Sequence, residues 1–256
     1  MNSPVIAVLG LGEAGGRISA DLAAAGATVR GFDPRVPAPT GVTPASSDAD
    51  ACTGADLVIS VNSAHDAVGA LTQSLPACAP ATIWADFNTS APGLKQELAR
   101  VAAGAVEVVD VAVMAPVPPT GLRTPLTISG PAAAPAAALL SRYGADVQVI
   151  DGPVGLAATR KLLRSVYYKG LAAAVVEALE AARAAGLEEW LSANIRSELE
   201  RSNAATLDRL VSGSHTHAVR RREEMAAAAD LLDELGVPPR IAAASRDWLA
   251  DLADRA

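Results

Sequence analysis

The sequence predicts an α/β fold in which an N-terminal doubly wound sheet of the Rossmann type is followed by an all-helical domain. Up to about residue 150, short apolar runs alternate with helical patterns, which is typical of a parallel sheet covered by helices. After Val149-Ile150-Asp151-Gly152-Pro153 the strand-like runs stop. Abundant alanine and an aromatic content of only 3% favour closely packed helices. We therefore expect one domain over residues 1–151 and another over 152–256.

Each expected strand is a short apolar run. The runs cover residues 4–9, 28–33, 57–61, 82–86, 106–113, 125–129 and 147–150. The segment from Met114 to Thr124 contains three prolines and a glycine, which predicts an irregular loop at a strand end. Ligands of doubly wound sheets bind at such strand ends.

The second domain is expected to begin with one long helix over about 154–185. Further helices are expected over 188–212, 217–235 and 239–254. So much Ala- and Leu-rich helix cannot hide every apolar stripe around one small core. The pattern therefore predicts a homodimer that forms through the helical domain.

A glycine-rich turn, Gly10-Leu11-Gly12-Glu13-Ala14-Gly15, lies between the first expected strand and a helical pattern. In a dinucleotide-binding turn, Gly10 permits the sharp bend, Gly12 lets the backbone approach the pyrophosphate, and Gly15 lets the helix pack against the strand. The positive end of the helix dipole then faces the phosphates. Strand, turn and helix in this order predict a dinucleotide site.

The acid expected at the end of the second strand is Asp33, which is placed to accept hydrogen bonds from a ribose 2′-OH. Arg35 follows two residues later and is of a type that binds a 2′-phosphate. We expect NAD as the cofactor, with NADP possible, because Asp33 holds the strand-end position and Arg35 lies in a proline-bounded loop.

The composition argues against several functional classes. The formal net charge is −7 and basic residues form no long tract, which disfavours nucleic-acid and anionic-membrane partners. The two cysteines, Cys52 and Cys78, lack metal-ligand spacing, and we expect no metal site. The N-terminus does not resemble a signal peptide, and no apolar stretch has the length of a membrane span. We expect a soluble cytoplasmic protein that acts on a small molecule.

Three motifs resemble those of the β-hydroxyacid dehydrogenases, the family that includes 3-hydroxyisobutyrate and 6-phosphogluconate dehydrogenases. They are the glycine turn at 10–15, the segment Asp86-Phe87-Asn88-Thr89-Ser90-Ala91-Pro92, and Gly152-Pro153-Val154-Gly155 followed by Lys161. The resemblance covers nearly the whole chain and is nearest to a poorly characterised branch with a shorter helical C-terminal domain. It implies hydride transfer with a nicotinamide cofactor and partner helices that pack across a two-fold axis.

Departures from the family pattern fall on its substrate-binding positions. Asn88 replaces a serine, Met114-Ala115-Pro116 replaces a Ser-Gly-Gly loop, and Arg164-Ser165 replaces an asparagine pair. The reaction class therefore carries over better than the substrate. By resemblance, Thr89 and the strand-end segment Val61-Asn62-Ser63 contact the cofactor.

Lys161 is the candidate general acid and base. Apolar neighbours on its helix are expected to favour the neutral amine, which suits proton transfer near neutral pH. Ser165 and Lys169 fall on the same broad helical face and are candidates for substrate contact. The alternative for Lys169 is an exposed cation. Asn88 or Thr89 is also expected to cap the helix that contains Pro92.

These observations predict an NAD(P)-dependent oxidoreductase that acts on a small hydroxyacid-like alcohol or carbonyl. An imine reductase on the same scaffold is the first alternative, because altered substrate residues accompany a changed electrophile. A dinucleotide-binding sensor without turnover is the second.

Overall fold

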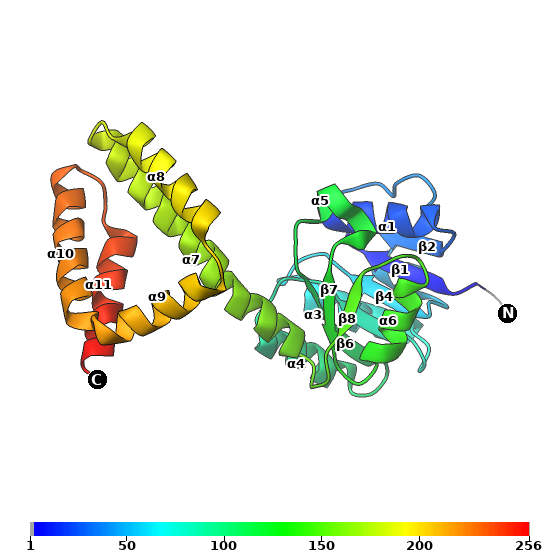
Figure 1. Ribbon diagram of the computed structural model, residues 1–256. Coiled ribbons are helices and arrows are strands. Elements are labelled where there is room, and N and C mark those ends of the chain that lie inside the picture. The colour runs from blue at the N-terminus through cyan, green and yellow to red at the C-terminus, as the bar shows by residue number, and fades with distance from the viewer. Residues whose placement is uncertain (1–2, 256) are drawn as a thin grey trace. The chain divides into compact units, whose positions relative to one another are not determined.

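The computed structural model describes residues 3–255 (Figure 1). By its internal contacts the chain divides into two compact units, residues 1–164 and 165–256. The division falls inside the long helix α7 (Leu156–Ala184), whose first residues belong to the first unit. The domain limits placed near residue 151 from the sequence stay a prediction.

The first unit contains a sheet whose strand order is β3-β2-β1-β4-β5-β6-β7-β8. All neighbours pair in parallel except β6 and β7. This is the predicted doubly wound fold, and the seven expected strands are confirmed to within one residue at each end. The strands are β1 (Val5–Leu9), β2 (Thr28–Phe32), β3 (Thr43–Pro44), β4 (Leu57–Ser60), β5 (Ile83–Asp86), β6 (Glu107–Val113), β7 (Leu126–Ser129) and β8 (Val147–Val149).

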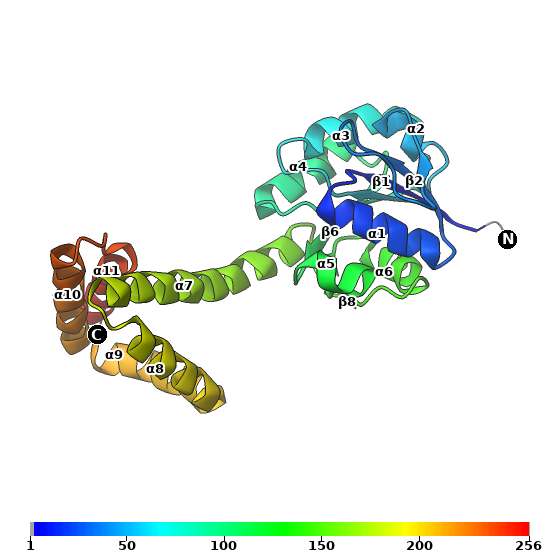
Figure 2. The same ribbon diagram turned by 90° about the horizontal axis from the view of Figure 1, so that it is seen from above.

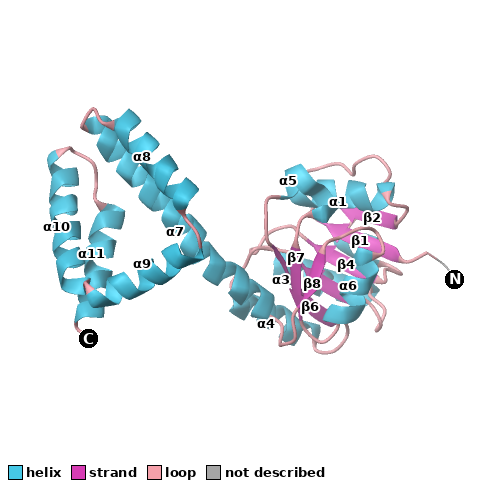
Figure 3. Ribbon diagram, in the orientation of Figure 1, coloured by secondary structure: helices cyan, strands magenta, loops and turns pink. Residues whose placement is uncertain are grey.

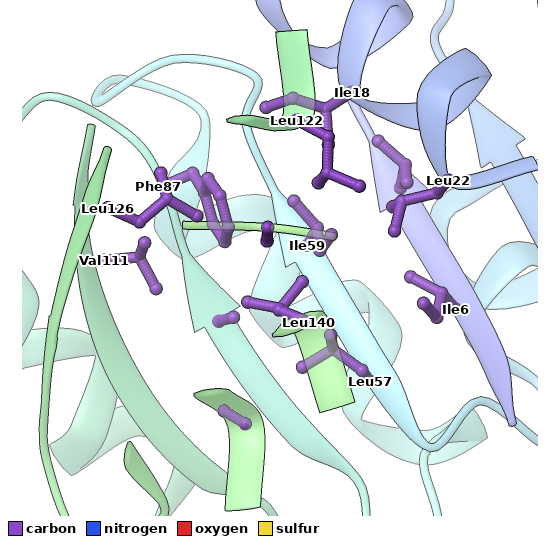
Figure 4. Close-up of a cluster of buried hydrophobic side chains, with 14 of the residues drawn as sticks. Ile6, Ile18, Leu22, Leu57, Ile59, Phe87, Val111, Leu122, Leu126 and Leu140 are labelled. Atoms are coloured by element: carbon purple, nitrogen blue, oxygen red, sulfur yellow. The ribbon is translucent and has the colours of Figure 1, made fainter. Parts of the chain in front are cut away.

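Helices cover both faces of this sheet, as Figure 2 shows. One face carries α1 (Glu13–Ala24), α5 (Val117–Thr120) and α6 (Ala133–Ser141), and its core includes the side chains in Figure 4. The other face carries α2 (Asp48–Cys52), α3 (Ala67–Ser74) and α4 (Pro92–Ala102) around the fully buried Trp84.

The strand order reverses between β1 and β4, because the chain leaves β1 toward β2 on one side and continues from β4 toward β5 on the other. Loops diverge at the carboxyl ends of these two strands and leave a crevice between them. The glycine turn that follows Leu9 and the segment Val61-Asn62-Ser63 that follows Ser60 both lie there.

Two local expectations differ from the structure. The segment 114–124, expected to be an irregular loop, contains the helical turn α5 and a 3-10 turn at Gly121–Arg123. Pro118 and Pro119 are compatible with α5 because the first helical residues need no N–H donor. The short strand β3 contains two residues and was not expected from the sequence.

The second unit consists of the greater part of α7 together with α8 (Glu188–Arg201), α9 (Ala204–Thr216), α10 (Ala218–Glu234) and α11 (Arg240–Ala253). Figure 3 shows only helices and connecting loops in this unit. The single helix expected over 188–212 is wrong, because the chain breaks at Ser202 and restarts at Asn203. The Asn203 side chain accepts from the backbone N–H of Thr206, whose hydroxyl accepts from the N–H of Asn203. Over residues 3–255, no helix combines the length and apolar character that a membrane crossing requires.

Candidate cofactor and active site

The glycine turn is closely packed against the segment that follows β4. Gly10 has φ +93°, and a Cβ on it would lie 2.7 Å from the Asn62 Cα. A Cβ on Gly15 would lie 2.0 Å from the Gly10 carbonyl oxygen. Side chains at either position would therefore push the strand, the turn and α1 apart, as the sequence predicted for two of the three glycines.

Gly12 behaves differently, because a Cβ there would meet no atom within 4 Å. Its surroundings leave room for a ligand, and Gly12 is also the N-cap residue of α1 without any side-chain cap. The first backbone N–H groups of a helix have no intrahelical acceptor. The open space, the unblocked N–H groups and the helix dipole fit the pyrophosphate of a dinucleotide.

A cavity of about 710 Å³ adjoins this turn and reaches Asp33 and Arg35. One Asp33 carboxylate oxygen accepts from the backbone N–H of Leu11 at 2.9 Å, and the other accepts from Arg35 at 2.8 Å and Val36 at 3.0 Å. Partial burial alone would raise the pKa of Asp33, but these three donors, helped by the Arg35 charge, lower it. Asp33 therefore also holds the glycine turn against the end of β2.

Acids predominate among the charged residues that line the same cavity. Besides Asp33, the described residues that border it include Glu13, Asp48 and Asp66, against the one arginine Arg35. Burial raises the pKa of Asp48, and the charges of Asp33 and Asp66 act in the same direction. This end of the site is therefore unfavourable for an additional phosphate.

Most of the remaining predicted residues line a second cavity of about 410 Å³. Ala14 of the glycine turn borders both cavities. The other predicted residues that line the second cavity are Val61, Asn62, Ser63, Asn88, Thr89, Ala115 and Lys161. The structure thus brings the segments after β1, β4, β5 and β6 together with the first turns of α7.

Lys161 and Thr89 are in direct contact in this cavity. The Lys161 Nζ donates a hydrogen bond of 2.7 Å to the Thr89 Oγ1. Lys161 is half-buried, and the neighbouring Leu162 and Leu163 are exposed in this chain. Of the other apolar neighbours expected from the sequence, Ala157 and Ala158 are buried and Leu156 is half-buried.

Neither Asn88 nor Thr89 caps α4, contrary to the sequence expectation, because the N-cap is Ala91 and no side chain caps it. The Asn88 Nδ2 instead donates to the Asp86 Oδ1 at 2.6 Å, the Asn62 Oδ1 at 3.0 Å and the Ser60 Oγ at 3.2 Å. Asn88 therefore ties the end of β4 to the end of β5 beneath the cavity.

A row of buried polar residues crosses the sheet and was not predicted from the sequence. Ser60, Asp86, Asp110 and Ser129 occupy paired positions on β4, β5, β6 and β7, and all four are fully buried. Ser60 and Asp86 end otherwise apolar strands, Asp110 lies in the middle of β6, and Ser129 ends β7. These polar residues are visible in the sequence, but the alignment of the four positions requires the sheet register.

Lys95, on α4, inserts its side chain into this row and is only 1% exposed. Its Nζ lies 2.6 Å from the Asp86 Oδ2 and 3.1 Å from the Asp110 Oδ1, and it donates to the Asp86 carbonyl at 2.8 Å. Burial raises the pKa of Asp86, although the Lys95 charge opposes this. We call Lys95, Asp86 and Asp110 the buried ion triad.

The remaining predicted residues are spread over two places. Met114 and Pro116 flank Ala115, and the carbonyl of Met114 accepts from the Arg164 Nη1 at 3.1 Å. Ser165 and Lys169 lie farther along α7, in the second unit. Within residues 3–255, no three His, Cys, Asp or Glu side chains are grouped as metal ligands.

Comparison with known proteins assigns two segments of the chain. Residues 5–118 match the family described as the NAD binding domain of 6-phosphogluconate dehydrogenase, and residues 182–252 match a domain of unknown function. An uncharacterized 28.5 kDa protein from the 7S RNA 5′ region of Methanothermus fervidus is 39% identical over 88 residues. That match spans 34% of this chain and about a third (35%) of the relative's length.

Similar solved structures extend over almost the whole chain. A conserved hypothetical protein from Sinorhizobium meliloti 1021 is 27% identical with a TM-score of 0.64, covering 97% of this chain and 88% of that one. A conserved protein of unknown function, described as structurally similar to 3-hydroxyacid dehydrogenases, is 29% identical with a TM-score of 0.64, covering 97% of both chains. An imine reductase variant from Myxococcus stipitatus, in complex with NAD⁺, has a TM-score of 0.84 at 19% identity, covering 99% of this chain and 95% of that one, and shows the fold alone.

These matches confirm the resemblance at the level of the cofactor domain and the fold. Residues 5–118 are similar to the NAD binding domain of 6-phosphogluconate dehydrogenase, and the fold of the chain is similar to that of imine reductases. Together they support an NAD(P)-dependent oxidoreductase of the dehydrogenase or reductase class.

Proposed function

We propose that the protein reduces a small carbonyl compound, or oxidises the corresponding hydroxyacid-like alcohol, with Lys161 as the general acid and base. The observation that carries this proposal is the contact between Lys161 and Thr89 in the cavity that Ala14 and Asn62 also line. A proton donor in a cavity that adjoins a dinucleotide-binding turn is what carbonyl reduction requires. A bound nicotinamide supplies or accepts the hydride.

The chain's own residues then have separate tasks. The glycine turn and the N-terminus of α1 hold the pyrophosphate, and Val61-Asn62-Ser63 lies along the cofactor beyond it. Thr89 accepts from Lys161 and so directs its amine into the cavity. Lys161 gives its proton to the substrate oxygen during reduction and takes it back during oxidation. Ser165 and Lys169 are proposed contacts of the substrate.

We propose NAD as the preferred cofactor. Glu13, Asp33, Asp48 and Asp66 all border the 710 Å³ cavity, and like charges disfavour a 2′-phosphate there. Arg35 lines the same cavity, so NADP is the weaker alternative rather than an impossible one.

An imine reductase is the second candidate. The replaced substrate positions favour it, since Asn88 is committed to Asp86, Asn62 and Ser60, and Ala115 offers the cavity no side-chain donor. Reduction of an imine leaves an amine and needs the same protonation, so Lys161 serves both reactions. A dinucleotide-binding sensor without turnover is the third.

A single substrate screen distinguishes these candidates. Purified protein is first titrated with NADH and NADPH. It is then assayed by nicotinamide absorbance with hydroxyacids and amino alcohols in the presence of NAD⁺ or NADP⁺, and with keto acids and cyclic imines in the presence of NADH or NADPH. Turnover of hydroxyacids or keto acids supports the proposal, whereas turnover of imines alone supports the second candidate. Binding of NAD(H) without turnover of any compound supports the sensor and contradicts the enzymatic proposal.

A further inference from the structure

We propose that Lys95 is a positioning residue for the reaction, because the buried ion triad fixes both the loop that carries Thr89 and the helical turn that carries Lys161. The catalytic consequence rests on the proposed function. The structural part of the inference stands on its own contacts.

The loop side of this arrangement starts at Asp86, the last residue of β5. Lys95 bonds both the backbone carbonyl and one carboxylate oxygen of Asp86, and Asn88 donates to the other oxygen at 2.6 Å. The chain leaving β5 is therefore held at Asp86 and again at Asn88. Thr89 is the next residue, so its hydroxyl has little freedom to move away from Lys161.

The helix side starts at Asp110 on β6. Its Oδ2 accepts from the backbone N–H of Ala158 at 2.7 Å, and the Ser129 Oγ accepts from that of Ala157 at 3.0 Å. These N–H groups belong to the first turn of α7, where intrahelical acceptors are lacking and a carboxylate is favourable. Lys161 follows Ala158 by three residues and lies on the same helical face.

Lys95 is the charge that makes this arrangement possible. Asp86 and Asp110 are paired across adjacent parallel strands and are fully buried, so their two charges repel each other in a medium of low dielectric. Without Lys95, nothing would offset the repulsion between these two carboxylates, and the hydrogen bond from the Ala158 N–H to Asp110 would be less firmly held. A small cavity of about 10 Å³ is bordered by Lys95, Asp110, Thr89 and Lys161, which places the triad directly beneath the pair.

The chain has only three lysines, Lys95, Lys161 and Lys169, which makes the inference measurable without a substrate. Lysines of the wild type and of Lys95→Met are dimethylated with ¹³C-formaldehyde and observed by NMR, with Lys161→Arg used for assignment. In parallel, hydrogen exchange is followed by mass spectrometry over residues 87–91 and 156–160.

For Lys95→Met we expect the Lys161 signal to move toward the position of the Lys169 signal, which itself stays unchanged. Exchange should accelerate at least about tenfold over 156–160, because the Ala158 N–H loses a strong acceptor. A folded Lys95→Met with wild-type Lys161 signal and wild-type local exchange would overturn the inference.

Leu98→Ala is the matched control. Leu98 is fully buried one turn after Lys95 on α4, so its truncation weakens the same helix without removing a charge. We expect faster exchange around α4 but an unmoved Lys161 signal. If Leu98→Ala and Lys95→Met give the same pattern, Lys95 acts on stability alone and the inference fails.

Asp110→Asn covers the case in which Lys95→Met does not fold, because it leaves a neutral pair of Lys95 and Asp86. Its Lys161 signal should also move, and an unchanged signal contradicts the inference.

Once a substrate is known, Lys95→Met should lower kcat about 10²-fold with KM and NAD(H) affinity within about twofold. Failure of the substrate screen would count against the proposed function, whereas the NMR and exchange results would still decide the role of Lys95.

Discussion

Lys161 is the residue on which the proposed chemistry depends most. Its amine donates to the Thr89 Oγ1 at 2.7 Å in the second cavity. We predict that Lys161→Met lowers kcat by 10²–10⁴-fold, the usual loss when a general acid is removed, with NAD(H) affinity within about twofold. Steady-state kinetics and a cofactor titration measure both quantities.

Lys169→Met is the matched control for this prediction, since it removes another lysine of α7 at an exposed position. It should bind NAD(H) like the wild type and keep its melting temperature. If Lys161→Met retains more than about a tenth of wild-type turnover, the proton comes from another group.

Asp33 has two functions in the structure, and a test of cofactor choice has to separate them. Asp33→Ala would remove the acceptor of three backbone N–H groups and loosen the glycine turn. Asp33→Asn keeps one oxygen and removes the charge. We predict that the wild type binds NADH more tightly than NADPH. Asp33→Asn should lower the ratio of the NADPH to the NADH dissociation constant about tenfold, because a hydrogen bond to a charged group contributes about 1.5–3 kcal/mol.

Fluorescence titration with both cofactors measures this ratio, and Arg35→Gln is its counterpart. It should weaken NADPH binding alone, because Arg35 is the single arginine that borders the cavity. A wild type that prefers NADPH would contradict the assignment of Asp33 and make Arg35 the determinant.

Among individual residues, the sequence predicted those that have a local sequence signature. It did not predict residues whose role depends on how neighbouring strands align in the sheet. The glycine turn and Asp33 were predicted because order along the chain is sufficient to place them, and Lys161 was predicted from its match to a family motif. Lys95 was not predicted, since a lysine on an amphipathic helix is usually exposed and only the pairing of Asp86 with Asp110 shows why it is buried.

Among the helices and strands, the break between α8 and α9 shows how a local sequence motif starts a new helix. The Asn203 Oδ1 accepts from the backbone N–H of Thr206, and the Thr206 Oγ1 accepts from the backbone N–H of Asn203. We predict that Asn203→Ala lowers the free energy of unfolding by about 1 kcal/mol, the usual cost of an N-cap. Urea unfolding followed by circular dichroism measures the change.

Asn203→Asp keeps the acceptor and should cost little, which makes it the control. A loss below about 0.3 kcal/mol for Asn203→Ala would mean that the cap contributes little to stability. The signal was present in the sequence as Ser202-Asn203 with Thr206 three residues later. Helical periodicity continues across the break, and we therefore expected one helix over 188–212.

The strands were easier to predict than the helix ends, because each is an apolar run between turn residues. Ile6–Leu9 and Leu57–Ile59 are buried on both faces of the sheet, so their sequences are continuously apolar. The two-residue β3 lacks such a run. Its pairing with β2 is fixed by the path of the chain after Val42 rather than by its own sequence.

On the scale of the whole molecule, the second unit leaves many large apolar side chains exposed. α8 and α9 contain no buried residue, and the cores near α10 and α11 are small. Large apolar side chains of this unit are at least half exposed at Val166, Tyr167, Tyr168, Val176, Leu187, Trp190, Leu199, Leu207, Leu210 and Val211. So much exposed apolar surface is characteristic of an association face.

We predict that the protein is a homodimer formed through the helices of the second unit. Leu207, Leu210 and Val211 follow a spacing of three and four residues along α9 and thus form one apolar stripe. Obligate homodimers bury extensive apolar surfaces, and a charge in such a surface is costly. Light scattering after gel filtration should give twice the chain mass of 25.9 kDa for the wild type.

The double change Leu207→Glu and Leu210→Glu should shift the protein toward monomer, whereas Arg209→Glu, which is outside the stripe, should leave the dimer intact. A monomeric wild type at micromolar concentration would rule out the prediction. A dimer that tolerates the double change would place the interface on other helices of the unit, for example on the exposed side chains of α7 and α8. Because a two-fold interface uses the same patch on both subunits, one disruptive change acts twice, and even a modest local cost should be visible in the measured mass.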